Sequence, residues 1–235
     1  MRASPPQQQA AGIRISRVTH AYGSRAVLED VDLTITQHKT AVIGGNGSGK
    51  STFARLINGL VVPTRGRVSV DGMDTASQGK RVRRRVGFVF QDPDAQIVFP
   101  TVAEDVAFGL KARREPPNAI AERVAAVLDD YGLSGYADHP AHLLSGGQKQ
   151  MLALAAVLVL DPSYVVLDEP MTLLDLKNKR QVTEMVLALQ QPVVLATHEL
   201  DMLGEFERVV VLDSGRIVAD GSPAESVRTY RRLMD

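Results

Sequence analysis

The sequence has no cysteine among its 235 residues, which excludes disulfides, cysteine metal sites and thiol catalysis and fits a reducing compartment. It also has no net charge, because 27 basic residues balance 27 acidic ones. The balance gives no whole-chain electrostatic reason to expect binding to nucleic acid or, for the isolated chain, to a membrane surface.

Long apolar runs are missing as well. The longest covers residues 151–160, well short of the roughly 20 residues that span a bilayer. Residues 1–11 are polar and rich in proline and glutamine, without the apolar segment of a signal peptide. We therefore expect a soluble chain with a disordered lead over residues 1–11. The apolar fraction of 44% is ample for a folded core.

The glycine-rich stretch 44–51 is the strongest motif. Its sequence GGNGSGKS fits G-x-x-x-x-G-K-S, follows an apolar run typical of a strand, and precedes a helical pattern that ends at Gly59. Glycines let consecutive backbone N–H groups surround a phosphate, and the helix start adds partial positive charge. This pattern predicts a nucleoside triphosphate site, with Lys50 on the phosphates and Ser51 on Mg²⁺; a chance glycine-rich turn is the weaker alternative.

Two further apolar runs end in polar residues that suit this chemistry. The run 164–167 ends at Asp168 and Glu169, so Asp168 is predicted to support Mg²⁺ and Glu169 to accept a proton from water. The run 192–197 ends at His198, for which a phosphate or water contact is preferred over a purely structural role. Two solvated acids at a strand end are the alternative for the carboxylates.

Gln91 and Tyr22 are weaker candidates. Gln91 follows the apolar strand pattern 86–90, and the carboxyl ends of parallel strands are where ligands bind in open sheets. Tyr22 lies between two alternating strand patterns, 13–18 and 31–35. Its position alone fits a half-buried loop aromatic as well as a flat ring on which adenine stacks.

Residues 92–160 lack strand patterns and predict a helical lobe inserted into an α/β core over residues 12–91 and 161–235. Near its end, LSGGQ at 144–148 opens a helix that is apolar nearly all round. This start fits a second phosphate-recognising helix, the alternative being an ordinary serine N-cap followed by two glycines. The basic run 80–85 is interpreted as a solvated face, residues 208–220 as a hairpin, and residues 230–235 as a frayed tail.

Taken in order, these motifs resemble the nucleotide-binding domain of ATP-binding-cassette (ABC) proteins, and LSGGQ separates that family from other phosphate-loop NTPases. The resemblance covers nearly the whole chain. It implies an α/β P-loop NTPase core with an antiparallel β subdomain and an inserted α-helical subdomain. It also implies an ATPase that uses ATP and Mg²⁺, with each ATP sandwiched in a head-to-tail dimer.

The resemblance assigns roles residue by residue. The implied catalytic residues are Glu169, His198 and Gln91, and the implied Mg²⁺ residues are Ser51, Gln91 and Asp168. The implied ATP-binding residues are Tyr22, Gly44, Asn46, Gly47, Ser48, Gly49, Lys50, Ser51 and Thr52, and across the dimer Ser145, Gly146, Gly147, Gln148 and Asp175. The chain departs from the family pattern at Met171 and Leu173, where small residues are usual, which puts cross-site communication rather than hydrolysis in doubt.

Residues 92–97 and 101–109 are similar to ATPases of energy-coupling-factor (ECF) transporters, which import vitamins and transition-metal ions. The implied partners are a second copy of the ATPase in a homodimer, a transmembrane coupling (T) protein on the helical lobe and a substrate-binding membrane (S) protein, without nucleic acid. The implied location is peripheral, on the cytoplasmic face of the cell membrane. Residues 54–60 and the short C-terminal segment are most similar to the biotin system.

Other functions remain as alternatives. A cobalt or nickel ECF importer, or another ABC transporter, keeps every nucleotide motif. A soluble ABC ATPase of translation or DNA repair usually joins two cassettes or carries a long arm, and this chain shows neither pattern. A phosphate-loop kinase would not explain LSGGQ at 144–148.

Overall fold

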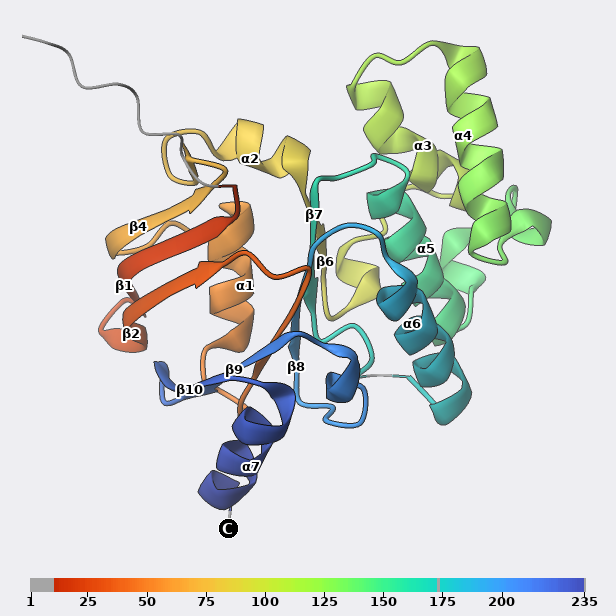
Figure 1. The fold of residues 1–235 in the computed structure, drawn as a ribbon. Coiled ribbons are helices and arrows are strands. Elements are labelled where there is room, and N and C mark those ends of the chain that lie inside the picture. The colour runs from red at the N-terminus through yellow and green to blue at the C-terminus, as the bar shows by residue number, and fades with distance from the viewer. Residues whose placement is uncertain (1–10, 173, 235) are drawn as a thin grey trace, which may run out of the picture.

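The computed structural model describes residues 11–172 and 174–234 and has two sheets and a helical lobe (Figure 1). The larger sheet has the order β10-β9-β3-β8-β7-β6, and the smaller one has the order β2-β1-β4-β5. The expected α/β fold with an antiparallel β subdomain and a helical subdomain is therefore confirmed. Most of the expected N-terminal lead, residues 1–10, lies outside the described residues, as do Leu173 and Asp235.

The larger sheet carries the predicted apolar strands. All neighbouring strands run parallel except β10, which pairs antiparallel with β9. Its side chains alternate between two buried clusters, with Ala41 and Ile43 on one face and Val42 on the other. Its strands are β3 (Lys39–Ile43), β6 (Val86–Val89), β7 (Tyr164–Asp168), β8 (Val193–Thr197), β9 (Arg208–Asp213) and β10 (Arg216–Gly221).

The smaller sheet is antiparallel and lies on the other side of α1 (Lys50–Asn58) from the larger sheet (Figure 1). Tyr22 ends its first strand, whereas the sequence pattern placed it in a loop, because pairing with Arg25 extends the hairpin to the turn at Gly23 and Ser24. Its strands are β1 (Ile13–Tyr22), β2 (Arg25–Ile35), β4 (Arg65–Val70) and β5 (Met73–Asp74).

The basic run forms a short helix, α2 (Gly79–Arg85), in which only Val82 is buried. Its cationic side chains contact local groups: Arg83 donates to the Gly59 carbonyl at 3.0 Å and Arg85 to the Asp71 carboxylate at 2.9 Å. The basic run is therefore a mostly exposed helix face, in agreement with the sequence interpretation.

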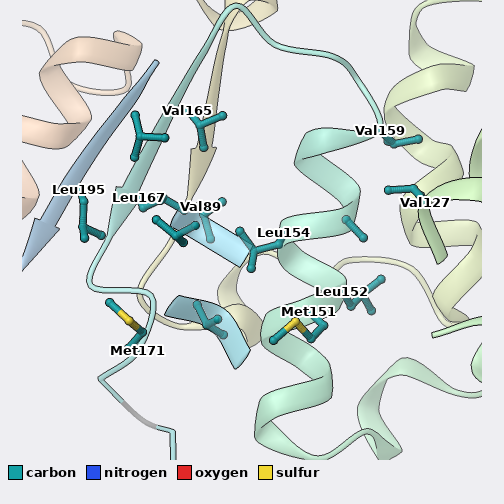
Figure 2. Close-up of a cluster of buried hydrophobic side chains, with 14 of the residues drawn as sticks. Val89, Val127, Met151, Leu152, Leu154, Val159, Val165, Leu167, Met171 and Leu195 are labelled. Carbon is teal, nitrogen blue, oxygen red and sulfur yellow. The ribbon is translucent and has the colours of Figure 1, made fainter. Parts of the chain in front are cut away.

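The described residues between 92 and 160 form helices and loops, with a single isolated bridge between Thr101 and Pro140. The capping box predicted at Thr101 and Glu104 is present. In Figure 2, Leu154 lies near Val89 of the sheet, and Val159 lies beside Val127. The lobe contains η1 (Pro93–Ala95), α3 (Val102–Ala112), α4 (Pro117–Asp130), η2 (Ser134–Tyr136), η3 (Ala141–Leu143) and α5 (Gly146–Leu158).

After β7 come α6 (Leu176–Ala188), η4 (Leu203–Glu205) and a final helix, α7 (Pro223–Met234). The interpretation of residues 230–235 as a frayed tail is wrong for 230–234. The Ser222 hydroxyl donates to the Glu225 carboxylate at 2.6 Å, and Pro223 suits the first helical position. The buried Ser226 hydroxyl then donates to the Val209 carbonyl at 2.7 Å and fixes the helix on the sheet. Over the described ranges, no helix combines the length and apolar character needed to cross a membrane.

Candidate nucleotide-binding site

The phosphate loop leaves the helix start at α1 open. Gly49 precedes Lys50 in a left-handed conformation, with φ at 105°, and no side chain caps the helix. A Cβ at Gly49 would lie 2.7 Å from Leu28, and one at Gly44 would lie 2.2 Å from the Leu212 carbonyl oxygen. Glycine is therefore required at both places. The helix start keeps its N–H groups free of side-chain caps, as an anion site requires.

The loop borders a cavity of about 770 Å³, a volume typical of small-molecule sites. Tyr22 stands at its rim with 50% of its surface exposed, so the ring is accessible for stacking. The predicted site residues that line the cavity are Tyr22, Gly44, Asn46, Gly47, Gly49, Lys50, Ser51, Thr52, Gln91, Glu169 and His198.

Ser48 and Asp168 lie below this surface. The Ser48 N–H donates to the Gly45 carbonyl at 3.2 Å, so this residue supports the loop from beneath. Asp168 is fully buried, and neither carboxylate oxygen has a hydrogen-bond partner at normal distance. Its closest cation is the Arg55 guanidinium at 3.7 Å. Burial raises the pKa of Asp168, while the neighbouring Ser51 hydroxyl and Arg55 act against that rise.

A buried carboxylate with free oxygens beside a serine hydroxyl has the donor chemistry that Mg²⁺ prefers. Within residues 11–172 and 174–234 there is no group of three or more His, Asp or Glu side chains that could hold a metal alone. The residues present therefore fit a magnesium ion whose remaining ligands are phosphate oxygens and water, as in phosphate-loop NTPases.

Glu169 is surrounded by groups from three other positions. Its Oε1 lies 3.1 Å from the Lys50 ammonium, while its Oε2 accepts from the Thr172 hydroxyl at 2.8 Å and contacts Nδ1 of His198. Burial raises the pKa of Glu169, but the Thr172 hydrogen bond and the Lys50 charge outweigh burial and hold it below its usual value. The carboxylate is thus ionised and oriented, as a proton acceptor must be.

Lys50 has further contacts within its own loop. Its ammonium donates to the carbonyl oxygens of Gly44 at 2.9 Å and Gly45 at 3.1 Å. The side chain is almost fully buried, with 5% exposed. Lys50 therefore joins the phosphate loop to Glu169, two motifs far apart in the sequence.

The LSGGQ segment, residues 144–148, lies outside the cavity that the phosphate loop borders. Ser145 caps α5 in a capping box with Gln148, whose N–H lies 3.3 Å from the Ser145 hydroxyl. A Cβ at Gly147 would lie 2.2 Å from the Asn178 side chain, so close packing also accounts for this glycine, whereas Gly146 faces open space. The serine N-cap considered as the alternative is thus present. The residues of this motif, with Asp175, are absent from the cavity lining in the described part of the chain.

The cavity also contains residues that the sequence patterns did not single out, namely Arg25, Val27, Thr172 and Tyr230. Tyr230 reaches it from α7, one turn beyond the anchored Ser226. The Ser-Pro-x-Glu pattern at 222–225, a helix N-terminus signal, could have revealed this helix.

Comparison with protein families identifies the family of this chain, because the family model described as "ABC transporter" matches residues 28–172. The chain belongs to the ABC transporter family. As an ABC ATPase it binds and hydrolyses ATP, and it is the ATP-binding subunit of an ABC transporter. The resemblance inferred from the motifs is thereby confirmed.

The sequences of related proteins align with nearly the whole length of this ABC ATPase. An ABC transporter ATP-binding protein of Deinococcus radiodurans is 53% identical over 94% of this chain and 98% of its own length. The biotin transport ATP-binding protein BioM of Rhizobium etli is 47% identical, covering 91% and 95%. The energy-coupling factor transporter ATP-binding protein EcfA1 of Halalkalibacterium halodurans is 38% identical, covering 91% and 80%.

Solved structures share the fold. The cbiO1 protein of Clostridium perfringens, part of the ABC transporter complex cbiONQ, superimposes with a TM-score of 0.81 at 32% identity, covering 94% of this chain and 92% of that one. The cassette MJ0796, in a dimeric post-hydrolysis state with ADP and Pi, has a TM-score of 0.81 at 28% identity, covering 90% and 98%.

Proposed function

We propose that this ABC ATPase powers import of a micronutrient through an ECF transporter and that the solute is biotin. The observation that carries the proposal is the 47% identity to BioM of Rhizobium etli over 91% of the chain. The similarity of residues 92–109 to ECF ATPases and the likeness to EcfA1 support the transporter class.

In the proposed reaction, each motif has one task. Tyr22 stacks on adenine, while the phosphate loop and Lys50 bind the phosphates. Ser51, Gln91 and Asp168 would hold Mg²⁺, which would neutralise phosphate charge when bound. Glu169 accepts the proton of the attacking water, and His198 contacts the γ-phosphate. The ionised, hydrogen-bonded state of Glu169 supports this assignment.

We further propose a head-to-tail homodimer in which each copy completes the other's site. Ser145, Gly146, Gly147, Gln148 and Asp175 do not line the cavity of their own chain. Ser145 and Gly146 are exposed and so are accessible to a second copy. The dimeric MJ0796 structure with ADP and Pi supports this arrangement. Two ATP molecules close the dimer, and hydrolysis reopens it.

The membrane partners are assigned to the helical lobe. We place the T protein against residues 92–160 and an S protein in the same complex, on the cytoplasmic face of the membrane. A cavity of about 240 Å³ lies between the core, residues 12–91 and 161–235, and the lobe. It is lined by Leu60 and Phe88 on one side and Val157 and Leu160 on the other, which supports docking of an apolar segment there.

The proposal is tested by purifying the tagged chain from its native membranes in mild detergent and identifying every co-eluting protein and small molecule by mass spectrometry. Two integral-membrane partners with bound biotin are expected. Recovery of the chain alone, or with ribosomes or DNA, would contradict the importer. The same preparation from an untagged strain is the control.

A cobalt or nickel importer is the second candidate, because the cbiO1 structure of the cbiONQ complex has the same fold with a TM-score of 0.81. Recovery of two membrane partners with bound cobalt or nickel would keep the transporter class and replace biotin as the solute.

A further inference from the structure

Glu199, the residue after His198, lies close to the other ring nitrogen of that histidine. His198 contacts Glu169 through Nδ1, and its Nε2 lies 3.9 Å from Oε1 of Glu199. This separation is too long for a hydrogen bond. The imidazole is therefore placed between two carboxylates but is engaged by only one of them.

The same Glu199 oxygen forms an ion pair with the ammonium of Lys179. Both side chains are partly buried, with exposed fractions of 32% for Lys179 and 28% for Glu199. The Glu199 N–H also donates to the Thr197 hydroxyl at 3.0 Å, which fixes the backbone at the end of β8. Lys179 is thus ion-paired with the Glu199 carboxylate, which would otherwise be the acceptor for Nε2.

Lys179 belongs to the first turn of α6. Its N–H donates to the Asp175 carbonyl at 2.8 Å, and the Asp175 carboxylate caps the helix by accepting from the Asn178 N–H at 2.8 Å. Val182 and Val186 are buried and hold the helix on the core. A shift of the helix start would therefore move the Lys179 ammonium relative to Glu199.

We propose that Lys179 and Glu199 are a positioning pair that keeps Nε2 of His198 free for the nucleotide and ties the His198 loop to the start of α6. The inference rests on the proposed roles of His198 and Asp175. Without Lys179, the Glu199 carboxylate becomes an acceptor for the Nε2–H that is present when both ring nitrogens carry protons, and it then draws the imidazole away from the γ-phosphate. Because Asp175 begins the same helix, movement of the second copy at Asp175 reaches His198 through this pair.

The test measures kcat, KM and nucleotide affinity of the purified transporter complex. Lys179→Met should lower kcat by about tenfold with the Kd for a fluorescent ATP analogue unchanged. Lys179→Arg, which keeps the positive charge, should retain most of the wild-type rate. Lys179→Met combined with Glu199→Gln should be faster than Lys179→Met alone, because the competing carboxylate is gone. A recovery of kcat without a parallel recovery of the thermal midpoint separates this role from one in stability alone. Arg67→Met, which breaks the exposed pair with Asp74, is the matched control.

A wild-type kcat for Lys179→Met, or a double variant no faster than the single one, would overturn the inference. Thermal midpoints of all variants are measured beside the rates, so that loss of folded protein is recognised. The variant Glu169→Gln distinguishes failure of the positioning pair from failure of the proposed nucleotide site. If it is inactive while Lys179→Met is normal, only the positioning pair fails; if it retains full turnover, the proposed site itself fails.

Discussion

The Lys50 ammonium lies 3.1 Å from the Glu169 carboxylate, and both side chains are almost fully buried, with 5% and 7% exposed. Glu169 is therefore the counter-ion of Lys50 in this structure. A γ-phosphate brings negative charge to the same ammonium and competes with Glu169 for it. In the proposed mechanism, entry of ATP is thus coupled to release of the carboxylate toward water, so that binding prepares Glu169 to act as the proposed base.

The first prediction concerns stability. Lys50→Met should lower the free energy of unfolding by about 2–4 kcal/mol, because it leaves the Glu169 charge buried without its lysine counter-ion. Adding Glu169→Gln should recover at least about 1 kcal/mol, since the unpaired charge is then removed. Urea unfolding of the four proteins in the absence of nucleotide measures this coupling. Strictly additive losses would contradict the pairing.

Glu169→Gln should keep ATP binding, abolish turnover and trap the ATP-bound dimer, because the amide fills the same space but cannot accept the proton. Phosphate release and gel filtration with ATP measure the two effects. Glu122→Gln, an exposed change on α4, is the matched control and should behave as wild type.

A mixing experiment tests the dimer. Lys50→Ala and Ser145→Arg should each be inactive alone, since one damages the phosphate loop and the other the LSGGQ segment. Mixed dimers contain one site built from the intact phosphate loop of one chain and the intact LSGGQ of the other. The mixture should therefore regain part of the ATPase rate. No gain on mixing would contradict the head-to-tail arrangement.

Tyr230 should contribute to nucleotide affinity because it lines the cavity from α7. Tyr230→Ala and Tyr22→Ala should each raise the Kd for ATP several-fold, within the roughly tenfold that loss of an aromatic contact allows. Fluorescent nucleotide titration measures both. Tyr136→Ala in the helical lobe is the comparison, and an equal effect there would point to general destabilisation.

The nucleotide site was predictable where a local pattern carries its chemistry. The sequence pattern alone places Lys50 after a strand and at the start of a helix, and it places Glu169 at the end of an apolar strand. Tyr230 was not predictable in this way. Its place at the cavity depends on β10 returning along β9 and on Ser226 bonding to Val209, which are contacts between segments far apart in the chain.

Met171 illustrates the same limit. The sequence marked it as a departure from the family, with cross-site communication in doubt. In the structure it is buried in the core shared by sheet and lobe, with its sulfur 3.3 Å from the Thr183 hydroxyl (Figure 2). The larger side chain thus fills interior space, a packing demand that no motif expresses.

A pH prediction follows from Tyr164, whose hydroxyl donates to the Asp71 carboxylate at 2.7 Å. Burial, together with this contact and the Asp71 charge, raises the pKa of Tyr164 to about 12 from 10.0. The unfolded chain therefore loses this proton first, so the free energy of unfolding should fall as pH rises from 10.0 towards about 12. Urea unfolding should show a smaller fall for Tyr164→Phe; an identical fall would contradict the assignment.

The apolar core that joins the sheet to the helical lobe also determines how the chain unfolds. Leu154 of α5 shares one apolar cluster with Val89 of β6, Leu167 of β7 and Leu195 of β8 (Figure 2). Separating the lobe would expose that cluster on both sides, at roughly 25 cal/mol for each Å² uncovered. Lobe and sheet are therefore expected to unfold as one cooperative unit. The lobe therefore depends for its stability on the sheet surface against which it packs.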